Sequence, residues 1–189
     1  MNVPGPMPGP AFRRLALMPA RHLDEVFRSG VAPDYAELAG REFLGWNPPR
    51  MAQLIGIGKF VKGFDPVGEP PAGGPPELLG RGYNRAVRRS RLTDPWVLAG
   101  PPGDAGRFGF YEVRRVRPDA PGRDARHPNA LLLDYGAGGN PWWSPTRALR
   151  DYIVRVDVGP ESVYLGKAYL ALGPLRVFAS HFLIGASAG

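Results

Sequence analysis

Two polar side chains on apolar segments could act as an acid or a base. Asp134 directly follows the run Leu131-Leu132-Leu133, and a carboxylate beside apolar surface can have a raised pKa and act as a general base. His181 interrupts the apolar segment 177–183, where an imidazole could transfer a proton. Each also has a structural interpretation: Asp134 could cap a turn or pair with a nearby arginine, and His181 could be a hydrogen-bonded core histidine. We take both as catalytic candidates.

The chain carries no further signature of catalysis. It has no nucleophile elbow, no phosphate-binding loop and no cluster of residues with metal-ligand spacing. It also has no cysteine, which excludes disulfides, thiol nucleophiles and thiolate zinc sites. The sequence therefore predicts neither a metal nor a cofactor, and it does not name a reaction.

A glycine-rich loop at 136–143 ends in two adjacent aromatic residues, Trp142 and Trp143. Neighbouring residues on an extended segment point to opposite sides, so we expect one ring to point inward and the other to line a mouth or face a partner. Which of the two points inward stays open, and both could instead cover the rim as a lid without a ligand. Ser144 followed by Pro145 predicts a short helix to about residue 150, which would orient the loop.

Other aromatic and polar side chains could meet the same opening. Lys167 and Tyr169 share one face of their predicted strand, and a tyrosine–lysine pair can transfer protons. The predicted ligand-binding residues are Trp46, Tyr83, Tyr111, Asp134, Trp142, Trp143, Lys167, Tyr169 and His181.

These side chains need strands to position them, and the last two thirds of the chain supply six clear strand patterns. They cover residues 80–88, 107–117, 129–135, 152–157, 162–172 and 175–184. Two further segments, 41–47 and 54–61, can be read as strands, although 51–61 also fits a glycine-weakened helix. About eight strands in sequential order predict a mainly β fold, a single antiparallel meander barrel wide enough for one small ligand.

The first forty residues predict a different kind of structure. Proline stands at every second position from residue 4 to residue 10, with two glycines between the prolines, so we expect residues 1–12 to form a disordered leader. A short amphipathic helix follows at 20–29, and a further helical turn reaches residue 39. These form a helical cap on one barrel domain over 13–189, in which 68–76 is a Pro/Gly-rich loop.

The net charge of +7 is concentrated between Leu78 and Arg126, where eleven arginines face five acidic residues. Consecutive arginines on strands project to both faces, so we interpret them as solvated outer surface and consider nucleic acid an unlikely partner. No apolar run approaches the ~20 residues that span a bilayer. We expect a soluble, cytoplasmic protein of bacterial type, and the oligomeric state stays open.

The order of a helix, a first strand with Gly45-Trp46 and an antiparallel meander resembles the lipocalin family. The resemblance covers about residues 40–184 and implies a barrel with one internal ligand site. It also implies that Trp46 plugs the barrel floor and that Arg176 stacks over it. The sequence departs from the family pattern because Leu44, rather than glycine, stands two residues before Trp46.

Three functional hypotheses follow. The first is non-enzymatic binding of a small lipophilic or aromatic molecule inside the barrel lumen. The second is a small enzyme of the cyclase or isomerase type that uses Asp134 or His181 as acid or base. The third is an interaction subunit that docks a protein through Trp142 and Trp143.

Overall fold

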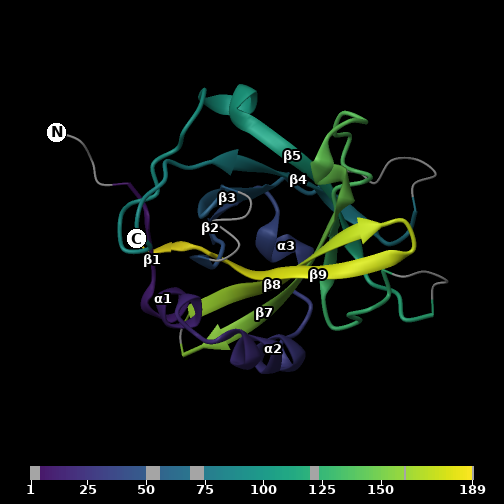
Figure 1. The fold of residues 1–189 in the computed structure, drawn as a ribbon, viewed down its shortest axis with the longest axis horizontal. Coiled ribbons are helices and arrows are strands. Elements are labelled where there is room, and N and C mark those ends of the chain that lie inside the picture. The colour runs from purple at the N-terminus through teal and green to yellow at the C-terminus, as the bar shows by residue number, and fades with distance from the viewer. Residues whose placement is uncertain (1–4, 50–55, 69–74, 120–123, 160, 189) are drawn as a thin grey trace.

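The protein forms a closed, eight-stranded antiparallel barrel in the computed structural model (Figure 1). The structure describes residues 5–49, 56–68, 75–119, 124–159 and 161–188. The barrel strands are β2 (Glu42–Trp46), β3 (Lys59–Phe64), β4 (Leu78–Ala86), β5 (Arg107–Arg115), β6 (Leu131–Asp134), β7 (Leu149–Val158), β8 (Glu161–Leu172) and β9 (Leu175–Gly185). The prediction of a mainly β meander barrel is confirmed.

Each barrel strand pairs with the next along the chain, and β9 closes the ring by pairing with β2. Gly45 lies opposite Ile184 at this closure. The tight β8–β9 connection uses Gly173, whose φ of 53° lies in the left-handed region that favours glycine. A complete ring leaves no unpaired strand edge in the barrel.

Alternation along the strands builds two apolar cores. One core fills the lumen and contains inward-facing residues such as Phe43, Tyr111 and Phe182. The other lies on the outer face, where α1 (Pro10–Ala16) and α2 (Ala20–Ser29) pack against β7, β8 and β9 (Figure 1). The chain therefore buries both faces of these three strands.

The third helix, α3 (Tyr35–Leu38), closes one end of the barrel. Its N-cap Asp34 accepts a hydrogen bond from the amide of Ala36 at 3.1 Å. Tyr35 and Leu38 belong to the lumen core, so this helix enters the barrel rather than covering its side. We call this end, where β2 and β8 begin and β7 and β9 end, the α3 mouth.

The disordered leader predicted for residues 1–12 is wrong from residue 7 onward. Met7–Pro8 form β1, which pairs with β10 (Ser187–Ala188), and α1 begins at Pro10. Proline is well suited to the first turn of a helix, and burial of the Phe12 ring holds that helix on the barrel. Residues 1–4 lie outside the described residues.

Two other expectations are settled only in part. In the ambiguous segment 51–61, residues 59–61 belong to β3, whereas 51–55 lie outside the described residues, as do 69–74 of the predicted loop. The helix predicted after Ser144 is a single 3₁₀ turn, η2 (Pro145–Ala148), and another, η1, covers Gly103–Gly106. Among the described residues, no helix is long and apolar enough to cross a membrane.

Candidate functional site

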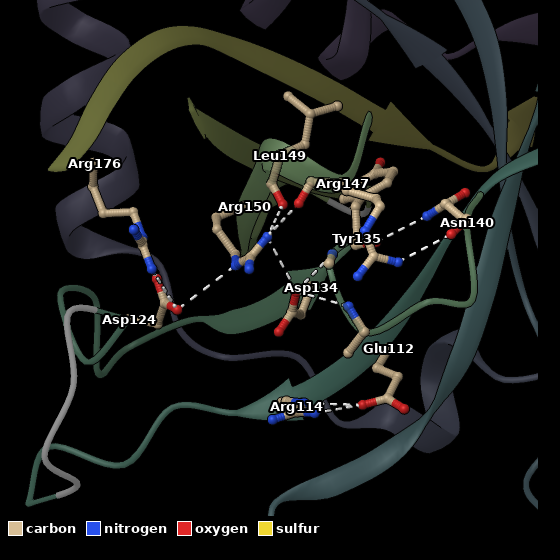
Figure 2. Close-up of polar contacts among 12 residues, drawn as sticks. Glu112, Arg114, Asp124, Asp134, Tyr135, Asn140, Arg147, Leu149, Arg150 and Arg176 are labelled. Atoms are coloured by element: carbon tan, nitrogen blue, oxygen red, sulfur yellow. Dashed lines mark hydrogen bonds and ion pairs between the residues drawn. The ribbon is translucent and has the colours of Figure 1, made fainter. Parts of the chain in front are cut away.

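The tryptophan loop faces solvent. Trp142 and Trp143 are 87% and 69% exposed, so the expectation that one ring points inward is wrong. Asn140 holds the loop from the inner side: its amide donates to the carbonyl of Tyr135 at 2.9 Å (Figure 2) and to that of Phe110 at 2.6 Å. The Asn140 side-chain oxygen also accepts from the Phe110 amide at 2.9 Å. Asn140 takes the inward position, and both tryptophans project away from the barrel.

Asp134 is a turn cap and an ion-pair partner. Its carboxylate accepts hydrogen bonds from the amides of Gly136 and Ala137 at 2.8 and 3.2 Å. Arg150, the residue opposite it on β7, lies 3.2 Å away. The structural interpretation of Asp134 is therefore correct, and its carboxylate does not point into the lumen.

Figure 2 shows that Arg150 also contacts a second carboxylate, that of Asp124. The Arg150 Nε lies 3.6 Å from Asp124, which is also held by both ends of the Arg176 guanidinium at 2.6 and 3.1 Å. Burial opposes ionisation of Asp124, but its arginine partners outweigh that effect and lower its pKa. This arrangement fastens the loop before β6 to β7 and β9.

Lys167 and His181 lie on the outer face of the barrel beneath α2. Both contact one oxygen of Asp24 on α2, Lys167 Nζ at 2.5 Å and His181 Nε2 at 3.1 Å. Burial lowers the pKa of His181, although Asp24 acts in the opposite direction. His181 is thus a hydrogen-bonded core histidine, and neither side chain reaches a barrel opening.

Three more predicted ligand residues also have outer positions. The Tyr169 hydroxyl lies 2.9 Å from His127 Nε2, and the Tyr83 hydroxyl donates to Glu42 at 3.0 Å. Trp46 packs against the outer core instead of plugging the floor. Its expected lipocalin-like partner, Arg176, is bound to Asp124 as described above.

Of the predicted ligand residues, Tyr111 does face the lumen. Its hydroxyl donates to the Gly63 carbonyl at 2.7 Å, and its ring lies 4.6 Å from the Nζ of Lys62. Lys62 is 1% exposed, and its Nζ donates to the Tyr135 hydroxyl at 2.7 Å and lies 3.4 Å from Asp151. Burial lowers the pKa of Lys62 and raises that of Asp151.

Side chains of the protein itself occupy the centre of the lumen. The rings of Phe60, Tyr111 and Phe182 each lie directly over a strand glycine, where a Cβ atom would collide with them; the glycines are Gly45, Gly82 and Gly166. Glycine inside a strand often marks such a close approach. The lumen centre is therefore part of the packed core, and the space for a ligand lies elsewhere.

That space lies at the α3 mouth, where a cavity of about 560 Å³ opens between α1, α3 and the barrel rim. Its lining residues are Gly9, Pro10, Phe12, Glu37, Arg41, Phe43, Arg155, Glu161, Ser162, Val163, Tyr164, Gly185 and Ala186. Residues from both helices and from four barrel strands, β2, β7, β8 and β9, contribute, so the complete fold is needed to form it.

Aromatic rings form the inner wall of the mouth cavity. Phe43 and Tyr164 meet edge to face with ring centroids 5.4 Å apart, and both belong to the lumen core. The chain has seven tyrosines, and six of them have hydroxyl partners in the structure. Tyr164 differs: it is 4% exposed, and its hydroxyl has no hydrogen-bond partner among the described residues. Burial raises its pKa, so the hydroxyl stays protonated at neutral pH.

Charged groups surround the rim of the mouth cavity and are largely engaged with one another. Arg155 donates to Glu37 at 2.6 Å, and its Nε lies 3.5 Å from Asp157. Arg41 donates to the Glu37 carbonyl at 3.2 Å and lies 5.2 Å from the Phe43 ring centroid. Glu161 accepts the amide of Ala11, the second residue of α1, at 3.3 and 3.4 Å.

Comparison with known proteins adds no relative: no family model, no curated protein and no solved structure matches the chain. Within the described residues, no group of three or more His, Asp or Glu side chains is placed to hold a metal ion. The chemistry of the site therefore rests on the residues of the mouth cavity itself.

Proposed function

We propose that the protein binds one small aromatic or lipophilic molecule in the mouth cavity, without catalysing a reaction on it. The observation that carries the proposal is a cavity of about 560 Å³ with a wall of Phe43 and Tyr164, in which the Tyr164 hydroxyl has no hydrogen-bond partner among the described residues. This volume is typical of sites for small organic molecules, which combine apolar walls with a few polar groups.

The proposal moves the ligand from the lumen centre, where the sequence analysis expected it, to the end of the barrel. It keeps the class of ligand, because the mouth is lined by Phe12, Phe43, Val163 and Tyr164. A flat ring that packs against Phe43 and Tyr164 would gain apolar burial and edge-to-face contacts.

A fluorescent neutral probe, N-phenyl-1-naphthylamine, tests this directly. We expect the wild-type protein to bind one probe molecule, and we expect Ala186→Trp to weaken binding at least ~10-fold, because Ala186 lines the cavity and has an exposed side chain that a larger ring would extend into the space. Trp142→Ala, at the opposite end of the barrel, is the matched control and should leave affinity unchanged. Equal affinity of wild type and Ala186→Trp would contradict the proposed location.

Native mass spectrometry of protein purified from its own host supplies an independent test. We expect a copurified small molecule that is lost in Ala186→Trp and retained in Trp142→Ala. A molecule retained in both variants would place the binding site elsewhere.

A further inference from the structure

The polarity of the mouth cavity indicates which polar group its ligand carries. Tyr164 lies on β8 directly opposite Arg155 on β7 and Ile184 on β9, so its side chain points inward at the α3 mouth. A hydroxyl that a ligand covers loses its water, and this is costly unless the ligand supplies a hydrogen-bond partner. A ligand oxygen placed beside the Tyr164 hydroxyl would avoid that cost, whereas a hydrocarbon would incur it.

The charged groups do not offer the same opportunity to a charged ligand. Glu37 is paired with Arg155, and Glu161 is engaged by the first turn of α1. Arg41 is exposed, donates to a main-chain carbonyl and covers the Phe43 ring. A ligand charge held against the aromatic wall would lose its water without meeting, in the described part of the chain, an unpaired buried charge of the opposite sign, and such desolvation is expensive.

We infer that the ligand of the mouth cavity is an uncharged aromatic or lipophilic molecule that carries a carbonyl or hydroxyl oxygen, and that this oxygen bonds to the hydroxyl of Tyr164. The inference rests on the proposed function, whose site it shares. Tyr164 acts as a specificity-determining residue: it selects an oxygen-bearing ligand over a hydrocarbon of the same shape.

A series of competitors on one ring system tests the inference by displacement of N-phenyl-1-naphthylamine. The series comprises 2-acetonaphthone, its hydrocarbon counterpart 2-isopropenylnaphthalene, the anion 2-naphthoate and the cation 2-naphthylmethylammonium. We expect the ketone to bind about 3- to 10-fold more tightly than the hydrocarbon, the range that one net hydrogen bond supplies. We expect both ions to bind at least ~10-fold more weakly than the ketone.

Tyr164→Phe removes the hydroxyl and keeps the ring. In this variant the ketone should lose its advantage over the hydrocarbon, whereas the affinity of the hydrocarbon should stay the same or rise. Tyr169→Phe removes a hydroxyl from the outer face and should leave the whole series unchanged. A variant that only disturbed the fold would weaken ketone and hydrocarbon together.

Two results would overturn the inference while leaving the proposed function intact: tighter binding of either ion than of the ketone, or a ketone advantage that survives in Tyr164→Phe. Failure of the neutral probe to bind the wild-type protein would instead overturn the proposed function, and the inference with it. The two failures are therefore distinguished by the first titration.

Discussion

The ammonium of Lys62 donates a 2.7 Å hydrogen bond to the hydroxyl of Tyr135 in the centre of the barrel. The same ammonium lies 3.4 Å from Asp151 and within 6 Å of the ring centroids of Tyr111, Tyr135, Phe60 and Phe182. One cation is thus surrounded by aromatic faces, which attract it through their quadrupoles. Lys62 and the side chains around it therefore form part of the structural core in the centre of the lumen.

Replacement of one member of the buried Lys62–Asp151 ion pair should destabilise the fold strongly. We expect Lys62→Met to lower the free energy of unfolding by about 3 kcal/mol, because it leaves the Asp151 carboxyl buried without its cation. The double variant Lys62→Met, Asp151→Leu should recover part of that loss. Urea denaturation of the three proteins measures both effects, and a loss below about 1 kcal/mol for the single variant would show that the pair is not a structural core.

Removal of a tyrosine hydroxyl should change the free energy of unfolding at one position and leave it unchanged at another. Tyr111→Phe leaves the Gly63 carbonyl without its 2.7 Å donor and should cost about 1 kcal/mol. Tyr164→Phe removes a hydroxyl without a partner among the described residues and should cost nothing measurable. Thermal or urea denaturation in the absence of ligand compares the two, and equal losses would mean that the Tyr164 hydroxyl is already engaged.

Substitutions of the exposed tryptophans and of Asn140 beneath them should have different effects on the free energy of unfolding. We expect Trp142→Ala and Trp143→Ala each to change the free energy of unfolding by less than about 0.5 kcal/mol, as is usual at exposed positions. Asn140→Ala should cost about 2 kcal/mol, since it removes three hydrogen bonds to the main chain. A large loss in either tryptophan variant would contradict the outward orientation of the loop.

His127 should make the stability depend on pH in mildly acidic solution. Burial, together with Lys167 and Arg126, lowers the pKa of His127 to about 4. Because the folded-state pKa lies below the ordinary value of 6.5, the unfolded chain binds its proton first. The contribution is therefore complete above about pH 6.5 and is lost as the pH falls toward 4.

Burial also lowers the pKa of His181, which acts in the same direction. We expect the free energy of unfolding to fall between pH 7 and pH 5, and we expect His127→Gln to show a smaller decrease than wild type. Denaturation curves at several pH values give both slopes. Parallel curves for the two proteins would refute the role of His127.

Most of the barrel could be predicted from the sequence, because runs of apolar and β-branched residues bounded by turn residues mark β4 to β9 within a few positions. These apolar runs do not show which face of a strand points into the lumen. On β8, α2 covers the outer face, so both faces are buried. Lys167 and Tyr169 lie under α2, while their small neighbours Gly166 and Ala168 face the lumen.

The site itself depends on relationships that are not local in sequence. A glycine on one strand opposite an aromatic residue on the next, as with Gly45 and Phe60, is a signal of a filled lumen that register alone makes visible. Tyr164 resembles the other tyrosines in its sequence surroundings. What distinguishes it is a hydroxyl without a partner in the described part of the structure, and this becomes visible only once α1 and α3 have been placed at the mouth.

A crystal structure of the protein with 2-acetonaphthone tests the mouth site most directly. We expect density for the ring against Phe43 and Tyr164 at the α3 mouth, with the ketone oxygen within hydrogen-bond distance of the Tyr164 hydroxyl. Density in the lumen centre beside Lys62, or against Trp142 and Trp143 at the opposite end, would contradict it.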